Sequence, residues 1–277
     1  MSYTWLFAAG INSYLSQLTR YCNKVNYIKN GRVHTIKFPQ TEKIIDENYE
    51  CVKFSEIDTD YSSHSYFENF FAKLYCKIKH SYYNITSNGY YYFIDIKKLN
   101  IGQEEDIKKI HEHYQNIETD HVIGYGVSRG AMALINWVGT CKPKRVRALI
   151  LEGTPTDLNT IEKYSSEWYN KFYYMGVKLI LPYISSYNPN SYYSKANVLD
   201  LPKDLPILFI TSLNDKMVPY NCSLEMYNTL ISNGYNKCKI VILKNPHHDN
   251  YLTDNDEDKL TYLSELNNFL LNVEELN

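Results

Sequence analysis

Residues 122–131 read VIGYGVSRGA, and this stretch decides the fold. It places Ser128 at the centre of a G-x-S-x-G pattern, directly after a short apolar run and directly before a helix-forming segment. A strand that turns sharply into a helix holds a serine hydroxyl clear of the backbone, and glycines are needed where one stretch of chain passes close to another. The stretch is therefore the sequence form of a nucleophile elbow, with Ser128 as the candidate nucleophile.

Helix and strand patterns alternate along the chain on both sides of the elbow. The segments expected to be helices are 102–115, 131–138 (which Gly139 and Pro143 should end), 223–233 and 257–274. The apolar runs expected to be buried strands are 146–151, 206–211 and 238–243. This alternation predicts the α/β class, with a mostly parallel central sheet covered by helices on both faces.

The N-terminal half carries further strand candidates. They are residues 5–9, 50–54 and 90–95, together with a hairpin over 25–38 around Asn30-Gly31. Either 5–9 or 50–54 can be the strand whose following loop completes a site beside Ser128. We favour 5–9, because it runs into Gly10 and glycine permits a close approach of the backbone.

An acid and a histidine pair follow the elbow. A serine hydroxyl needs an imidazole to take its proton, and an acid must orient that imidazole. Asp215 lies four residues beyond the strand expected at 206–211, and His247 and His248 follow the strand expected at 238–243. Loops that follow parallel strands meet at the carboxyl edge of the sheet, where α/β folds place their sites. Ser128, Asp215 and one of the histidines are therefore expected to meet there.

From about residue 90 to its end, the chain resembles the α/β-hydrolase family. The matching motifs are GYGVSRG at 124–130, NDKMVP at 214–219 and NPHHDN at 245–250, and the order Ser, Asp, His is the order of that family. The resemblance implies Ser128 as nucleophile, Asp215 as acid and His247 or His248 as base. The family pattern Gly-x-Gly-His followed by Asn or Asp favours His248, although both glycines are absent here.

The resemblance also implies an oxyanion hole. Its first donor would be the backbone N–H of Arg129, the residue after the nucleophile, and the second would be the N–H of Ile11 in the loop after Gly10. The family's His-Gly is missing at that loop. Glu152, at the end of the strand expected at 146–151, is an alternative to Asp215 as the acid.

The chain is expected to form a single α/β-hydrolase domain over 1–277, with a helical cap inserted at 155–205. That insertion is too long for a simple connection between two core strands, and it is rich in aromatic residues around Trp168 and Tyr173. Two interpretations stay open for these aromatics. They line a pocket for an apolar acyl group, or they only pack the cap onto the core.

Composition limits the classes of partner. The net charge is −2 and shows no basic stripe, so nucleic acid is not an expected partner. None of the six cysteines forms a C-x-x-C pair, which argues against a zinc site, and the proposed chemistry needs no metal or organic cofactor. The N-terminus lacks a basic region before its apolar run, and no run reaches membrane-spanning length. We therefore expect a cytoplasmic protein without stable membrane insertion.

The sequence thus predicts a serine hydrolase that cleaves an ester or thioester, in the manner of a carboxylesterase or lipase. The expected partner is a small-molecule substrate with an apolar acyl group, and the oligomeric state is undetermined. A peptidase of the same fold, an inactive binding protein and a non-hydrolytic enzyme of this fold are the alternatives.

Overall fold

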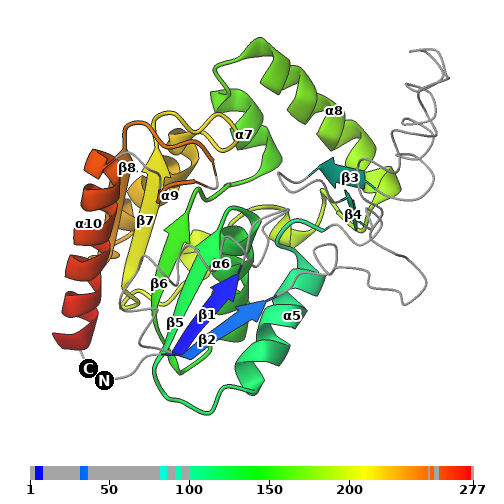
Figure 1. The fold of residues 1–277 in the computed structure, drawn as a ribbon. Helices are drawn as coiled ribbons and strands as arrows, with labels where there is room; N and C mark the ends of the chain where they lie inside the picture. Colours follow the sequence, from blue (N-terminus) through cyan, green and yellow to red (C-terminus); the bar gives the residue numbers. More distant parts are fainter. Residues whose placement is uncertain are drawn as a thin grey trace, which may run out of the picture.

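The computed structural model describes residues 4–8, 32–36, 82–85, 91–94, 100–248, 250–252 and 256–275. Its centre is a six-stranded, wholly parallel sheet in the order β2-β1-β5-β6-β7-β8 (Figure 1). The strands are β1 (Thr4–Ala8), β2 (Arg32–Ile36), β5 (Val122–Val127), β6 (Val146–Glu152), β7 (Ile207–Ser212) and β8 (Cys238–Leu243). The sheet confirms the predicted parallel α/β architecture.

Helices cover both faces of this sheet (Figure 1). Successive side chains of a strand point to opposite faces, so β1 sends Leu6 into one apolar cluster and Trp5 and Phe7 into another. The first cluster is shared with α5 (Glu104–Gln115), α6 (Arg129–Cys141) and α9 (Tyr220–Ser232), and the second with α10 (Asp256–Glu275). Burial on both faces explains why these strands read as continuous apolar runs in the sequence.

The prediction that Gly139 ends the helix after the elbow was wrong. Helix α6 continues to Cys141 and ends only at Lys142, which takes the left-handed conformation at φ 45°. A Cβ on Gly139 would lie 2.9 Å from the Cβ of Asp200. Gly139 therefore lies within the helix and allows another segment to approach it closely. The sequence pattern had suggested that the helix ends there.

The strand expected at 5–9 is β1, and its register places Ala8 beside Gly126 of β5. The end of β1 therefore lies next to the elbow. The described part of the expected hairpin, β2, pairs in parallel with β1 at the edge of the sheet. Residues 25–31 and the strand expected at 50–54 lie outside the described residues. The candidate at 90–95 is β4 (Tyr91–Ile94), which pairs antiparallel with β3 (Tyr82–Ile85) in a separate sheet.

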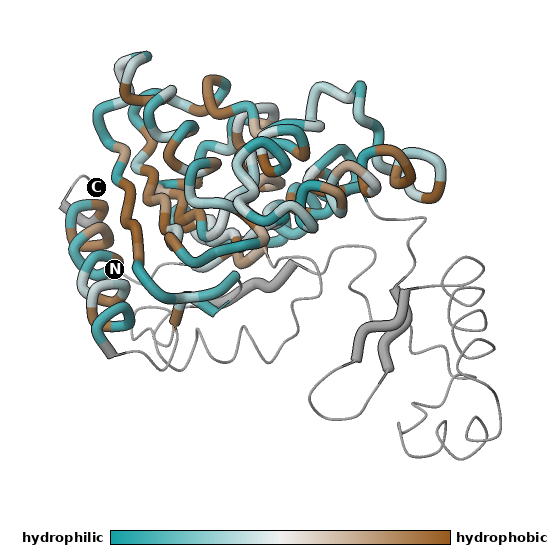
Figure 2. The backbone as a smooth tube through the Cα atoms, turned by 90° about the horizontal axis from the view of Figure 1, so that it is seen from above, coloured by the Kyte–Doolittle hydropathy of each residue, from teal (hydrophilic) through white to brown (hydrophobic). Residues whose placement is uncertain are grey.

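Between β6 and β7 the chain forms two helices, α7 (Leu158–Tyr164) and α8 (Trp168–Ile184), and two short 3-10 turns, Tyr192–Ser194 and Val198–Asp200. Helices α7 and α8 lie beyond the carboxyl ends of the strands (Figure 1). Apolar residues recur along the 17 residues of α8, as its hydropathy colouring shows (Figure 2). Within the described ranges, no helix is long and apolar enough to cross a membrane.

Candidate active site

Ser128 occupies a strained turn between β5 and α6. Its φ of 53° and ψ of −120° are rare for a residue with a side chain, and such conformations persist only where the surroundings hold them. Here the Ser128 N–H donates to the carbonyl of Glu152 at 2.8 Å. A Cβ on Gly126 would lie 2.5 Å from the Cα of Ala131, so glycine alone fits the first position of the G-x-S-x-G pattern. The turn presents the serine side chain at the end of the sheet.

Three side chains from separate loops meet at this turn. The Nε2 of His248 lies 2.9 Å from the Oγ of Ser128, and its Nδ1 lies 2.7 Å from the Oδ2 of Asp215. Both distances are within hydrogen-bonding reach. With the imidazole proton on Nδ1, where Asp215 accepts it, Nε2 is left to accept the hydroxyl proton of Ser128. The geometry is that required for a serine activated by a histidine.

The two adjacent histidines have different surroundings. His247 is exposed, and its Nδ1 lies 3.4 Å from the side-chain nitrogen of Asn214. The loop that carries them is held by polar contacts: the Oγ of Ser212 donates to the carbonyl of Pro246, and Asn214 donates to the carbonyl of Asn245. These contacts orient the loop so that His248 is the histidine that reaches Ser128.

Asp215 has no exposed side-chain surface, and its carboxylate is fully engaged. Its Oδ1 accepts the backbone N–H groups of Met217 and Val218 at 3.0 and 2.8 Å. A turn-forming aspartate would show the same bonds, so the local turn and the contact with His248 coexist. The alternative acid, Glu152, instead accepts the hydroxyls of Tyr125 and Tyr262 at 2.7 and 2.9 Å.

The side chain of Arg129 forms a buried ion pair with Asp106 of α5. Its Nε donates to the Oδ2 of Asp106 at 2.5 Å and a second nitrogen contacts Oδ1, and neither side chain has exposed surface. The sequence pattern predicts Asp106 only as one of three acids in the first turn of its helix. Its spacing of four residues from the buried Ile110 is the one local signal that Asp106 faces inward.

The backbone N–H of Arg129 belongs to the first turn of α6, whose end carries positive charge from the helix dipole. This is a suitable position for binding an oxyanion. Ile11, expected to supply the second donor, lies outside the described residues. In the parts of the chain that the structure describes, no group of three His, Cys, Asp or Glu side chains is placed to hold a metal ion.

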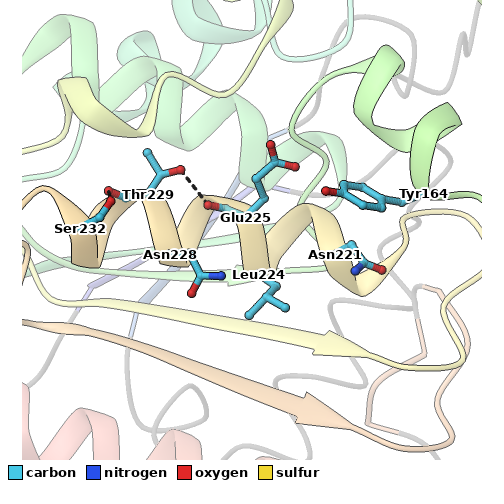
Figure 3. Close-up of a pocket in the computed structure, with 7 residues that line it drawn as sticks. All are labelled: Tyr164, Asn221, Leu224, Glu225, Asn228, Thr229 and Ser232. Carbon is cyan, nitrogen blue, oxygen red and sulfur yellow. Dashed lines mark hydrogen bonds between the residues drawn. The ribbon is translucent and has the colours of Figure 1, made fainter.

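A cavity of about 420 Å³ runs along α9 and meets Tyr164 of α7 (Figure 3). Its lining is Tyr164, Asn221, Leu224, Glu225, Asn228, Thr229 and Ser232. Ser128, Asp215 and His248 do not line it.

The model of the prolyl oligopeptidase family matches residues 101–274, which is more than half of the chain. The chain belongs to the prolyl oligopeptidase family. The match includes Ser128, Asp215 and His248, and it confirms the resemblance to α/β-hydrolases. The chain therefore has the α/β-hydrolase fold. No curated protein sequence matches the chain.

Similar solved structures include an esterase, a bromoperoxidase and a peptidase. The esterase Pf2001 of Pyrococcus furiosus superimposes with a TM-score of 0.53 at 12% identity, over 98% of this chain and 83% of the esterase. A bromoperoxidase from Bacillus anthracis gives 0.52 at 14% identity, over 98% and 92%. An acylaminoacyl peptidase from Pyrococcus horikoshii gives 0.48 at 20% identity, over 62% of this chain and 28% of the peptidase. The esterase and bromoperoxidase likenesses, at these low identities, show the fold alone.

Proposed function

We propose that this member of the prolyl oligopeptidase family hydrolyses an ester or thioester of an apolar acyl group through an acyl-enzyme on Ser128. The observation that carries the proposal is the chain of hydrogen bonds from Ser128 through His248 to Asp215, at 2.9 and 2.7 Å. Two further assignments belong to it: residues 1–277 form one domain, and 155–205 act as a cap over the site.

The mechanism follows from these contacts. As the Oγ of Ser128 attacks the carbonyl carbon, Nε2 of His248 takes the hydroxyl proton, and Asp215 stabilises the resulting imidazolium. The carbonyl oxygen becomes an oxyanion, which the N–H groups of Arg129 and Ile11 would bind; each such donor contributes about 3 kcal/mol to transition-state stabilisation. His248 then protonates the leaving alcohol or thiol. Water, deprotonated by His248, attacks the acyl-enzyme, and the proton returns to Ser128 as the acid departs.

The preference for an apolar acyl group rests on α8. The hydroxyl of Tyr174 donates to the carbonyl of Met217 at 2.6 Å, and Asn170 donates to the carbonyl of Lys216 at 3.2 Å. These bonds fix α8 to the loop that carries Asp215. The same helix leaves large apolar side chains uncovered, among them Trp168 and Phe172, which are 71% and 61% exposed. Exposed apolar surface on a helix that is bonded to this loop suits the binding of an acyl chain.

A substrate panel tests this preference. We expect kcat/KM for p-nitrophenyl esters to rise about tenfold or more from acetate to octanoate, since each buried CH₂ contributes about 0.8 kcal/mol. We expect the octanoate ester also to exceed N-blocked peptide p-nitroanilides. Membership of the prolyl oligopeptidase family favours the second candidate, a serine peptidase. A flat response to chain length combined with faster peptide cleavage would establish the peptidase and reject the esterase.

The histidine pair offers a matched test of the base. We expect His248→Ala to lower labelling by a fluorophosphonate probe at least about 10³-fold, because Ser128 loses its proton acceptor. His247→Ala, which removes an exposed imidazole, should label within about twofold of the wild type. Initial labelling rates measured by gel fluorescence give both values. The reverse pattern would make His247 the base, and a wild type that labels no faster than Ser128→Ala would point to an inactive binding protein.

A further inference from the structure

Tyr251 lies directly behind the proposed triad. It has no exposed surface, and its hydroxyl donates to the Oδ2 of Asp215 at 2.5 Å. This oxygen is the one that faces the Nδ1 of His248. Gly153 leaves the space for this arrangement, since a Cβ there would lie 3.1 Å from the hydroxyl of Tyr251 and 3.2 Å from Cε1 of His248.

The hydroxyl of Tyr251 keeps its proton across the working pH range. Burial raises the pKa of Tyr251 well above the ordinary value of 10.0, and the nearby charge of Asp215 together with the hydrogen bond to it raises the pKa further. The tyrosine is therefore a permanent hydrogen-bond donor. The partial positive charge on its hydroxyl hydrogen points at the carboxylate that His248 also contacts.

We propose that Tyr251 is a positioning residue, which fixes the carboxylate of Asp215 and weakens its attraction for the imidazolium form of His248. The inference rests on the proposed function. With Tyr251 in place, Oδ2 is shared between two donors, while Oδ1 is taken by the N–H groups of Met217 and Val218. The carboxylate cannot rotate without losing several hydrogen bonds, and less of its charge acts on His248. A base that is neutral near pH 7 can accept the proton of Ser128.

Among the described residues, two other titratable side chains act on Asp215 or Tyr251. Tyr174 of α8 approaches Asp215, and burial is the first cause that raises its pKa, with smaller contributions from Tyr173 and Asp215. Glu152, at the end of β6, acts on Tyr251 through its charge, but its carboxylate accepts the hydroxyls of Tyr125 and Tyr262. Tyr251 is thus the described tyrosine whose hydroxyl bonds directly to the acid of the triad.

The test compares two buried tyrosines that contact different carboxylates. In Tyr251→Phe, we expect the acidic limb of the pH profile of kcat/KM to move upward by about 0.5 pH unit, because a typical hydrogen bond corresponds to a shift of that order. KM at the alkaline plateau should stay unchanged. Tyr262→Phe is the matched control: it removes an equally buried hydroxyl, but from Glu152, and should leave the limb in place.

A second readout does not depend on turnover. The imidazole C–H resonance of His248, assigned by its loss in His248→Ala, should titrate about 0.5 pH unit higher in Tyr251→Phe than in the wild type. The inference is overturned if a folded Tyr251→Phe shows the wild-type pH profile of kcat/KM and the wild-type titration of His248. Tyr251 would then be a packing residue. Failure of the proposed function is a different result: the wild type then shows no hydrolysis that depends on Ser128, while the titration still reports on Tyr251.

Discussion

Replacing Ser128 with alanine is expected to lower kcat/KM for the best p-nitrophenyl ester by about 10⁴- to 10⁶-fold. The reason is chemical: without Oγ there is no atom to attack the carbonyl carbon, and the 2.9 Å contact with Nε2 of His248 disappears. Any residual rate would come from binding and from the oxyanion donors. Initial rates under pseudo-first-order conditions, normalised to the concentration of folded protein, provide the measurement.

The control for this variant is Ser232→Ala, which removes an exposed hydroxyl near the end of α9, outside the three triad loops. It should retain wild-type activity. Ser128→Ala should also unfold at a temperature close to that of the wild type, because the backbone conformation at φ 53° stays the same for alanine. Ester hydrolysis that persists in Ser128→Ala at more than about a tenth of the wild-type rate would mean that another nucleophile performs the reaction.

Replacing Asp106 with alanine is expected to lower the free energy of unfolding by about 3–5 kcal/mol. The cause is the charge of Arg129, which has no exposed side-chain surface and would lose the carboxylate that contacts it through two nitrogens. Arg129 also stands in the first turn of α6, which contains no acidic residue, so the helix dipole opposes its charge. Urea denaturation followed by circular dichroism measures the effect.

Two further variants separate the buried charge from other causes. Glu105→Gln changes an exposed acid in the same turn of α5 and should cost less than about 0.5 kcal/mol. The double variant Asp106→Ala with Arg129→Met should recover much of the lost stability, because removing both charges costs less than leaving one of them buried. If Asp106→Ala lowers the free energy of unfolding by less than about 1 kcal/mol, the ion pair does not make the proposed contribution to stability.

The meeting of Ser128, Asp215 and a histidine could be predicted because its signals are local. Ser128 and Asp215 each follow an apolar strand within a few residues, and parallel strands bring such loops to one edge. The histidine was less certain, since His247 and His248 share that local context. Their difference comes from contacts with Ser212 and Asn214 on another loop, which spacing along the chain does not encode.

Other features of the site depend on pairs that lie far apart in sequence. Asp106 and Arg129 are separated by 23 positions, and Asp215 and Tyr251 by 36. Neither Asp106 nor Tyr251 belongs to a motif, and each resembles an ordinary helix-start acid or loop aromatic when read alone. The prediction that Gly139 ends its helix was wrong for the same reason, because the spatial neighbour of Gly139 is Asp200 of a distant turn. Local patterns predict elements and their ends, whereas tertiary partners decide which polar side chains are buried.

The bonds from Tyr174 and Asn170 to the Lys216–Met217 segment limit how new specificity can arise in this protein. The same short stretch of backbone supports α8 on one side and, through the Met217 N–H, the carboxylate of Asp215 on the other. Exchanging the whole of α8 for a foreign helix would therefore disturb the acid along with the binding surface. Substitutions at outward positions such as Phe172 and Tyr183 avoid that conflict. The exposed face of α8 can therefore be substituted separately from the face that contacts the Lys216–Met217 segment.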